Sequence, residues 1–359
     1  MDFGIFNIMQ QRDRAKSARQ VYQEAIEQTV VAEQLGFKKA WYAEHHFSNY
    51  SLCSSPLMMV GHMAGRTNTI RLGTAVVVAP LYNPARLLSE IGMADVMSEG
   101  RLELGIGQGY QGYETDRFGV DLNRSGEMTD EMLDLLELGI SNRSFDYNGQ
   151  HYTLPRSAVA VRPLQKDLPI WYAGSNPTHL RRMARKRHGY LISGVLGGVS
   201  RMLKSRQAFE QAAREEGQDP ETIKIGIARM AFVTNKKSDA LHFMSCALYQ
   251  QRLSVSAKAR REKMTDDYVM EEVPYADEPT LDAIERNLPV GSVDRCIENM
   301  VRTIRTLRPH HIMIQTQVGD MDHKKSLASM ELWMSEVVPG IARELAKSNR
   351  ETEAANVAQ

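Results

Sequence analysis

Hydrophobic positions along the chain follow two periods that alternate from one end to the other. In 18–35, apolar residues such as Val21, Ala25 and Ile26 recur at the spacing of one helix face, whereas 70–79 has the apolar run of a strand buried on both faces. Strands and helices are therefore predicted in alternation. The predicted strands are 2–8, 39–44, 70–79, 101–107, 169–173, 190–193, 223–234 and 311–315, and the predicted helices are 18–35, 56–66, 84–98, 125–140, 177–188, 199–217, 238–256 and 324–346.

Eight successive strand–helix units predict an α/β fold, a (β/α)₈ TIM barrel. An open doubly wound sheet is the alternative, but eight units exceed its usual number. We expect one barrel domain over 1–346, with a polar insertion at about 257–288 before the last strand. Asn148-Gly149 lies between two short extended runs and predicts a β-hairpin, and 347–359 is expected to be a disordered tail. In such a barrel the active site lies at the carboxyl ends of the strands.

Composition narrows the class of partner and the compartment. The chain has 359 residues, and its 44 Lys and Arg balance 44 Asp and Glu, so neither nucleic acid nor an anionic membrane is expected as the main partner. The longest apolar run, 72–82, is too short to cross a bilayer, and no signal segment precedes the first strand. The three cysteines are widely spaced, which disfavours disulfides and structural zinc. These features indicate a cytoplasmic protein.

The second predicted strand ends in Glu44-His45-His46-Phe47. Two imidazoles and a carboxylate at the catalytic end of a barrel indicate a site that moves protons near neutral pH. Neighbouring strand residues point to opposite faces, so we expect one histidine to be catalytic and the other structural. No metal site is expected, because adjacent strand residues diverge and no H-x-H or H-E-x-x-H motif accompanies them. The alternative is that both histidines are structural.

Glycines cluster after the fourth predicted strand, over 105–112, and include a literal G-x-G-x-x-G at 107–112. The next predicted helix starts more than ten residues later, and the unit is the fourth rather than the first, so a Rossmann fingerprint is disfavoured. Residues without side chains would instead let a flat ring or a phosphate approach the backbone. A flexible loop is the alternative.

The fifth predicted strand ends in Ala173-Gly174-Ser175-Asn176-Pro177-Thr178, just before a helix. Small residues and hydroxyls at a helix N-terminus suit an anion, because free backbone N–H groups point outward there. Ser175 and Thr178 would cap the helix in the alternative interpretation. Elsewhere, His310-His311 opens the last strand at the opposite, stabilising face and is read as structural. The Met-rich helix 56–66 carries Gly61, Ala64 and Gly65, which would let a second helix approach closely in a dimer.

Taken together, these motifs resemble the luciferase-like flavin-dependent monooxygenase family, and most of all the bacterial luciferase alpha subunit. The resemblance spans about 1–346 and is loose in the insertion. The matching segments, in order, are Asp2-Phe3-Gly4-Ile5-Phe6, Trp41-x-x-Glu44-His45-His46-Phe47, Leu72-Gly73-Thr74-Ala75, Asn83-Pro84-Ala85-Arg86, Met97-Ser98-Glu99-Gly100-Arg101-Leu102 and Ala173-Gly174-Ser175.

The resemblance implies a two-component monooxygenase. Reduced FMN would come from a separate flavin reductase, react with O₂ to form a C4a-peroxyflavin, and oxidise an aldehyde, ketone or similar small organic substrate in a homodimer or heterodimer. His45 matches the catalytic histidine, and Glu44 would orient the local hydrogen bonds. A non-prolyl cis peptide is implied between Ala75 and Val76, beneath the flavin ring. The implied cofactor-binding residues are Ala75, Val76, Gly107, Gln108, Gly109, Tyr110, Gly174, Ser175 and Thr178.

The chain departs from the luciferase pattern at the phosphate site. Where the luciferase pattern has an arginine at that site, this chain has Gln108, and where it has the neighbouring cysteine, this chain has Gly107. The glutamate that precedes the position of Ser175 in the pattern is Gly174 here. Losing a charge-assisted contact would weaken flavin binding by roughly 1.5–3 kcal/mol unless Arg181 or Arg182 replaces it. Two alternatives stay open. One is a deazaflavin (F420)-dependent hydride-transfer enzyme of the same barrel superfamily, and the other is a non-catalytic flavin-binding partner subunit.

Overall fold

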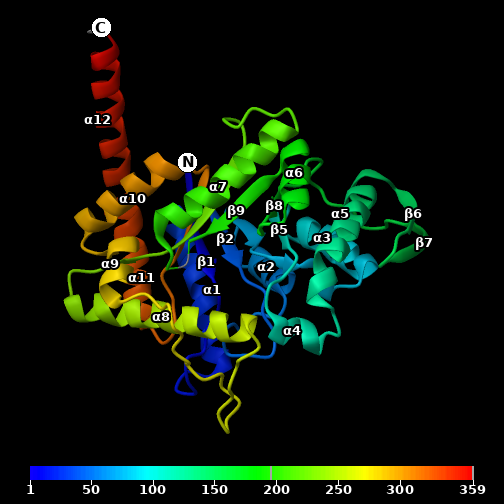
Figure 1. Ribbon diagram of the computed structural model, residues 1–359, viewed down its shortest axis with the longest axis horizontal. Helices are drawn as coiled ribbons and strands as arrows, with labels where there is room; N and C mark the ends of the chain where they lie inside the picture. The colour runs from blue at the N-terminus through cyan, green and yellow to red at the C-terminus, as the bar shows by residue number, and fades with distance from the viewer. Residues whose placement is uncertain (195, 358–359) are drawn as a thin grey trace.

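A closed barrel of parallel strands forms the centre of the molecule, with helices around it (Figure 1). The computed structural model describes residues 1–194 and 196–357. The strand order is β3-β2-β1-β13-β10-β9-β8-β5, and β5 pairs again with β3, which closes the ring and confirms the predicted TIM barrel. The barrel strands are β1 (Asp2–Asn7), β2 (Lys39–Tyr42), β3 (Arg71–Thr74) with its continuation β4 (Val77–Val78), β5 (Leu102–Gly107), β8 (Ile170–Tyr172), β9 (Gly189–Ser193), β10 (Lys224–Met230) and β13 (His311–Gln315).

Helices cover the outside of the barrel and start where the sequence supplies caps. Ser17, Ser55 and Asn83 each accept a hydrogen bond from a backbone N–H of the first turn, and Pro56 and Pro84 occupy the first helical position. The helices are α1 (Ala18–Gln34), α2 (Pro56–Ala64), α3 (Pro84–Met97), α4 (Gly112–Arg117), α5 (Ser125–Ser141), α6 (Pro177–Arg185), α7 (Gly198–Glu215), α8 (Lys237–Lys258), α9 (Leu281–Asn287), α10 (Val293–Leu307), α11 (His323–Leu332) and α12 (Val338–Val357).

Several elements differ from the sequence-based expectation. The helix α4 starts at Gly112, the last glycine of the cluster, so the expectation of no helix within ten residues was wrong. The helix α10 was not predicted. The final predicted helix, 324–346, is divided by a π-helical turn at Trp333–Val337, and α12 continues to Val357 where a disordered tail was expected. Residues 358–359 lie outside the described residues.

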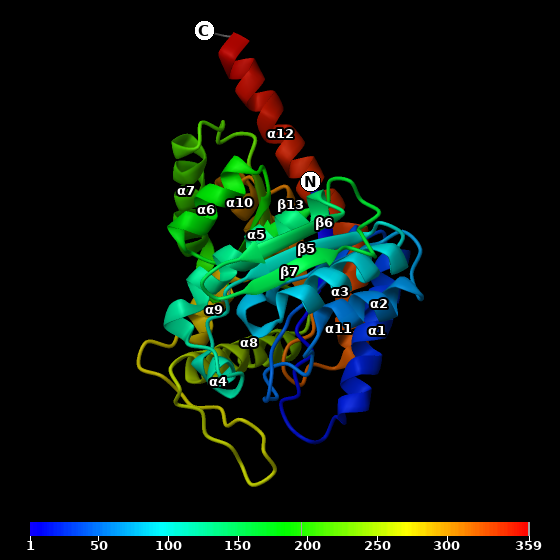
Figure 2. The ribbon, with the colours of Figure 1, turned by 90° about the vertical axis from the view of Figure 1, so that its right-hand side faces the viewer.

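The β-hairpin predicted around Asn148-Gly149 is confirmed as β6 (Ser144–Asn148) and β7 (Thr153–Ala158). Residues 259–280 form an irregular segment before α9. Figure 2 shows α4, α8 and this segment at one end of the barrel and the N-terminus at the other. Over the described part of the chain, no helix is long and apolar enough to span a membrane.

The barrel interior is filled in layers. Trp41 and Trp171 meet edge to face in the middle layer, with ring centroids 5.9 Å apart, and pack with Leu191 and Met313. Such a pair adds about 0.5–1.5 kcal/mol to the burial of the two rings. Small residues lie toward the carboxyl ends of the strands, and charged residues lie toward the amino ends. The two tryptophans therefore separate the two ends of the barrel.

Candidate active site

His45 lies at the carboxyl end of β2, where the chain leaves the barrel, and is 8% exposed. Its backbone N–H donates to the carbonyl of Cys53, 3.0 Å away. Its side chain contacts a carboxylate from another unit, because Nδ1 lies 3.0 Å from Oε1 of Glu114 in α4. The same oxygen accepts the backbone N–H of His46 at 2.7 Å. Glu114 therefore fixes both the imidazole and the backbone that carries it.

The geometry around His45 assigns its tautomer. A carboxylate only accepts hydrogen bonds, so Nδ1 carries the proton and Nε2 of the neutral ring keeps its lone pair. Within the described residues Nε2 has no hydrogen-bond partner. The rings of Tyr50 and Tyr110 lie edge to face with the imidazole, at 4.6 and 6.0 Å between centroids. Nε2 of His45 can therefore accept a proton, and it is free to contact a molecule bound beside the two tyrosine rings.

Glu44 and His46 form a second pair that points away from the first. His46 Nε2 lies 3.0 Å from Glu44 Oε1, while Glu44 Oε2 accepts the backbone N–H of Val78 at 3.1 Å and the hydroxyl of Tyr82 at 2.9 Å. Burial raises the pKa of the Glu44 carboxyl, and the bonds from His46, Val78 and Tyr82 oppose that shift. Glu44 thus orients local hydrogen bonds, but the histidine that it contacts is His46 and not His45. The partner of His45 is Glu114, which the sequence analysis missed.

A floor of small residues lies above the tryptophan pair. The implied cis peptide between Ala75 and Val76 is present, and both residues pack with Ala173 against the Trp41–Trp171 cluster. A Cβ atom on Gly107 would lie 2.9 Å from both Val76 Cγ2 and the carbonyl of Ala173. A side chain at position 107 would therefore displace Val76 or the Ala173 carbonyl, which explains the glycine.

The loop after β5 offers unused hydrogen-bonding atoms beside that floor. Gly109 has φ +76°, and a Cβ there would lie 2.8 Å from Val78 Cγ1, so glycine is required for the approach. The side-chain oxygens of Gln108 and Gln111 are buried and accept no hydrogen bond from the described residues. Tyr110 is 40% exposed, and its hydroxyl lies 3.5 Å from that of Tyr50. Buried polar atoms normally have partners, so these acceptors suit a ligand.

The end of β8 differs from the expected anion site. Asn176, rather than Ser175 or Thr178, caps α6 by accepting the backbone N–H of Thr178, and both hydroxyl-bearing residues are exposed. A Cβ on Gly174 would lie 2.2 Å from the hydroxyl oxygen of Tyr172, which explains the glycine without a ligand. The Gly174 carbonyl accepts a hydrogen bond from Tyr190 at 2.9 Å.

The two arginines expected to replace the missing phosphate contact are occupied elsewhere. Arg182 lies 2.7 Å from Asp134 and 2.9 Å from Glu137, and it is mostly buried between α5 and α6. Arg181 lies 3.6 Å from Glu215 at the end of α7. Both arginines therefore pair with carboxylates of neighbouring helices in this structure.

The residues fit the ring of a flavin better than its phosphate. The floor at Ala75, Val76 and Gly107 accepts a flat group, and the orphaned oxygens of Gln108 and Gln111 would accept its N–H groups. The described side chains of the β5 and β8 loops offer no cation, so a phosphate there would rely on backbone N–H groups and hydroxyls.

A group with metal-ligating side chains lies apart from His45. His242, Cys246 and Asp320 bring one ligand atom each within 4.8 Å of one another. Arg12 already donates to Asp320 Oδ1 at 3.0 Å. Burial, and to a smaller extent the neighbouring Asp320, raises the pKa of the Cys246 thiol to about 12. A protonated thiol beside a guanidinium is a poor cation site, and we assign none.

Comparison with known proteins places this geometry in a family. The family model described as luciferase-like monooxygenase matches residues 1–311. The chain belongs to the luciferase-like monooxygenase family. This confirms the resemblance drawn from the sequence motifs.

Relatives and solved structures agree with that assignment. The uncharacterized protein y4vJ of Sinorhizobium fredii is 40% identical, over 97% of this chain and 99% of its own length. The oxygenase component of flavin-dependent trigonelline monooxygenase from Acinetobacter baylyi is 25% identical, over 95% and 96%. Among solved structures, monooxygenase RslO1 of Streptomyces bottropensis has a TM-score of 0.82 at 22% identity, over 94% and 99% of the two chains. The oxygenating constituent of 3,6-diketocamphane monooxygenase of Pseudomonas putida, in complex with FMN, has a TM-score of 0.76 at 20% identity, over 94% and 98%.

Proposed function

We propose that the protein is the oxygenase component of a two-component, FMN-dependent monooxygenase that oxidises an aldehyde, ketone or similar small organic substrate. The observation that carries the proposal is the free Nε2 of His45, whose ring is held by Glu114 at the rim of the barrel beside a floor of small residues. The relatives that support it include the oxygenase component of a flavin-dependent monooxygenase and a solved structure in complex with FMN.

Each residue near the rim has a distinct part in this proposal. Reduced FMN would supply the two electrons that activate O₂, with one oxygen atom going to the substrate and the other to water. His45 Nε2 would accept a proton from the reacting oxygen or return it, and Glu114 would hold the proton on Nδ1. Glu44 would act through His46 and Val78 by fixing the end of β2.

Cofactor contacts are proposed for the floor and the two loops that border it. Ala75, Val76 and Gly107 would lie beneath the flavin ring, and Gln108, Gly109 and Tyr110 would contact its edge. Gly174, Ser175 and Thr178 would be near the phosphate, where exposed hydroxyls replace the missing cation. This arrangement predicts weaker FMN binding than an arginine would provide, by roughly 1.5–3 kcal/mol.

The proposed partners are a flavin reductase and a second subunit. Exposed methionines gather on α2 and α3, where Met58 is 74% exposed and Met93 and Met97 are 53% and 52% exposed. The two helices pack against each other, and Met97 lies over Gly61. An apolar surface of this kind is typical of a subunit interface, so we propose a dimer through α2 and α3. A cytoplasmic setting follows from the need for a reductase that supplies reduced flavin.

The test is His45→Ala with reduced FMN and O₂ supplied, using a panel of aldehydes and ketones. We expect wild-type protein to form oxygenated product and the variant to bind FMN equally well but release hydrogen peroxide instead, because water then competes in an incompletely organised site. Normal coupling in the variant would remove the assignment of His45. Preference of the wild type for a reduced deazaflavin, without oxygen consumption, would favour the hydride-transfer alternative. Inactivity of the protein alone with the reductase present would favour a partner subunit.

A further inference from the structure

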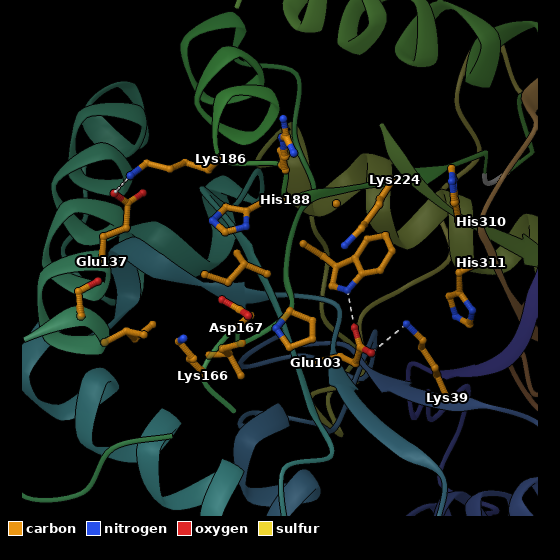
Figure 3. A pocket seen from close by; sticks show the side chains of 18 of the residues that line it. Lys39, Glu103, Glu137, Lys166, Asp167, Lys186, His188, Lys224, His310 and His311 are labelled. Atoms are coloured by element: carbon orange, nitrogen blue, oxygen red, sulfur yellow. Dashed lines mark hydrogen bonds and ion pairs between the residues drawn. The ribbon is translucent and has the colours of Figure 1, made fainter. Parts of the chain in front are cut away.

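A cavity of about 1120 Å³ opens at the end of the barrel opposite His45 (Figure 3). Its inner wall consists of residues at or next to the starts of the barrel strands, among them Asp2, Lys39, Gly189, Lys224 and His311. We refer to it as the amino-end chamber. The edge-to-face pair of Trp41 and Trp171 lies between this chamber and the floor of the proposed flavin site, so the two are separate sites.

A buried charge cluster with an excess of cations forms the deep part of the amino-end chamber. Glu103 forms an ion pair with Lys39 Nζ at 2.9 Å and accepts hydrogen bonds from Arg71 Nε at 2.5 Å and Trp171 Nε1 at 2.6 Å. Lys39 and Glu103 are 9% and 2% exposed. Two cations against one carboxylate leave a net positive charge. Lys39 has three N–H donors, and Glu103 is the one acceptor that the described residues give it. The ammonium also lies over the rings of Trp171 and Trp41, 5.0 and 6.0 Å from their centroids, so the donors that face away from these rings are the ones available to a molecule in the chamber.

His311 adds a neutral donor beside this cluster. Trp41 Nε1 donates to His311 Nε2 at 2.8 Å, so the neutral ring carries its proton on Nδ1. That atom is buried and makes no hydrogen bond of ordinary geometry, although the backbone of Asp2 favours its protonation weakly. Burial is the main cause that holds the pKa of His311 well below its usual range, and Lys39 adds to the shift. His311 Nδ1 is therefore a buried donor in the chamber wall that makes no hydrogen bond of ordinary geometry within the described residues.

Acidic side chains do not cancel this charge inside the chamber. Glu137 lies 3.0 Å from Lys186 on the outer wall, and Asp134 is paired with Arg182. The carboxylates of Asp2 and Asp167 are exposed and therefore screened by solvent. Lys224, on the rim, has no ion-pair partner within the described chain, so it adds a further free cation.

Apolar residues form the side of the amino-end chamber toward α5 and β8. Its members are Leu138, Ile140, Leu168, Pro169, Ile170 and Trp171. A ligand with one polar end and one apolar end matches the two sides of the cavity.

We propose that the amino-end chamber binds a small organic carboxylate. The carboxylate group lies toward Lys39, His311 and Lys224, where it satisfies the free donors and the excess positive charge. The apolar body lies against Leu138, Leu168 and Ile170. This inference does not depend on the proposed oxygenase activity, because the chamber shares no residue with the flavin site.

Benzoate is the probe that tests the proposal, with benzyl alcohol as its uncharged match. Binding of each probe to the full chain is measured by calorimetric titration. Tryptophan fluorescence gives a second measurement, because Trp171 borders the chamber. We expect benzoate to bind at least about tenfold more tightly than benzyl alcohol, and saturating FMN to leave its affinity unchanged.

Two variants and one control locate the binding. Lys224→Gln removes an exposed rim cation without affecting packing, and Lys39→Met removes the buried one; each is expected to raise the dissociation constant of benzoate about tenfold. Lys236→Gln makes the same charge change at an exposed position before α8 and should bind benzoate like the wild type. The proposal is overturned by no binding at millimolar benzoate, by equal binding of benzyl alcohol, by displacement with FMN, or by wild-type affinity in both chamber variants.

Discussion

Glu114→Gln is the sharpest test of how His45 is held. The substitution keeps the size of the side chain and an oxygen that still accepts the backbone N–H of His46, so the fold should persist. It removes the negative charge 3.0 Å from His45 Nδ1. A charge-assisted hydrogen bond is about twice as strong as a neutral one. The substitution should therefore weaken the interaction that holds the imidazole of His45 in place by about 1–2 kcal/mol. The expected result is a fivefold to thirtyfold loss of coupled oxygenation, at about 1.4 kcal/mol per factor of ten.

The assay measures oxygenated product and hydrogen peroxide formed per reduced FMN consumed. The ring-nitrogen NMR shifts of His45 provide an independent reading, because the oxygen that faces both His45 Nδ1 and the His46 N–H becomes a neutral amide oxygen, which weakens the hydrogen bond from Nδ1–H. Glu127→Gln is the matched control, since it removes a carboxylate that lies 3.1 Å from His151 Nε2 at an exposed site. Wild-type coupling together with wild-type ring-nitrogen shifts of His45 in Glu114→Gln would refute the reasoning.

Three further changes test other parts of the structure. Gly107→Ala places a Cβ 2.9 Å from Val76 Cγ2, so FMN should bind about tenfold more weakly in a flavin titration, whereas Gly65→Ala, with no atom nearer than 3.9 Å, should not affect it. Met58→Glu combined with Met93→Glu should convert the proposed dimer to a monomer in light scattering, while Leu241→Glu, at a residue 41% exposed on α8, should not. Glu33→Gln should lower the free energy of unfolding by roughly 1 kcal/mol at neutral pH, a value discounted for partial exposure. Burial alone would raise the pKa of Glu33, but hydrogen bonds from Thr69, Ile70 and Asn68 lower it, so this stabilisation is present above the unfolded pKa and is lost as pH falls through the folded one. A wild-type advantage that persists in acid denaturation curves would contradict that account.

The sequence was enough to predict the barrel because its order of elements depends on local signals. Apolar runs such as 70–79, the caps at Ser17 and Asn83, and the prolines at 56 and 84 each act within a few residues. Elements that depend on tertiary contacts were harder. The strand predicted over 70–79 divides at the cis peptide between Ala75 and Val76. The helix α4 follows the glycine cluster in a short segment whose pattern gave no helical signal.

For the candidate site, the sequence by itself determined that an imidazole stands at the end of β2 and that glycines follow β5. Only the tertiary structure decided which carboxylate holds that imidazole. Glu44 is adjacent to His45 in the chain but turns to His46, and Glu114 reaches it from α4 across the rim. It also decided that Arg181 and Arg182 face carboxylates on neighbouring helices rather than a phosphate. The reason is physical: hydrophobic period and caps act between residues near in sequence, whereas hydrogen-bond partners are set by how the closed barrel brings distant loops together.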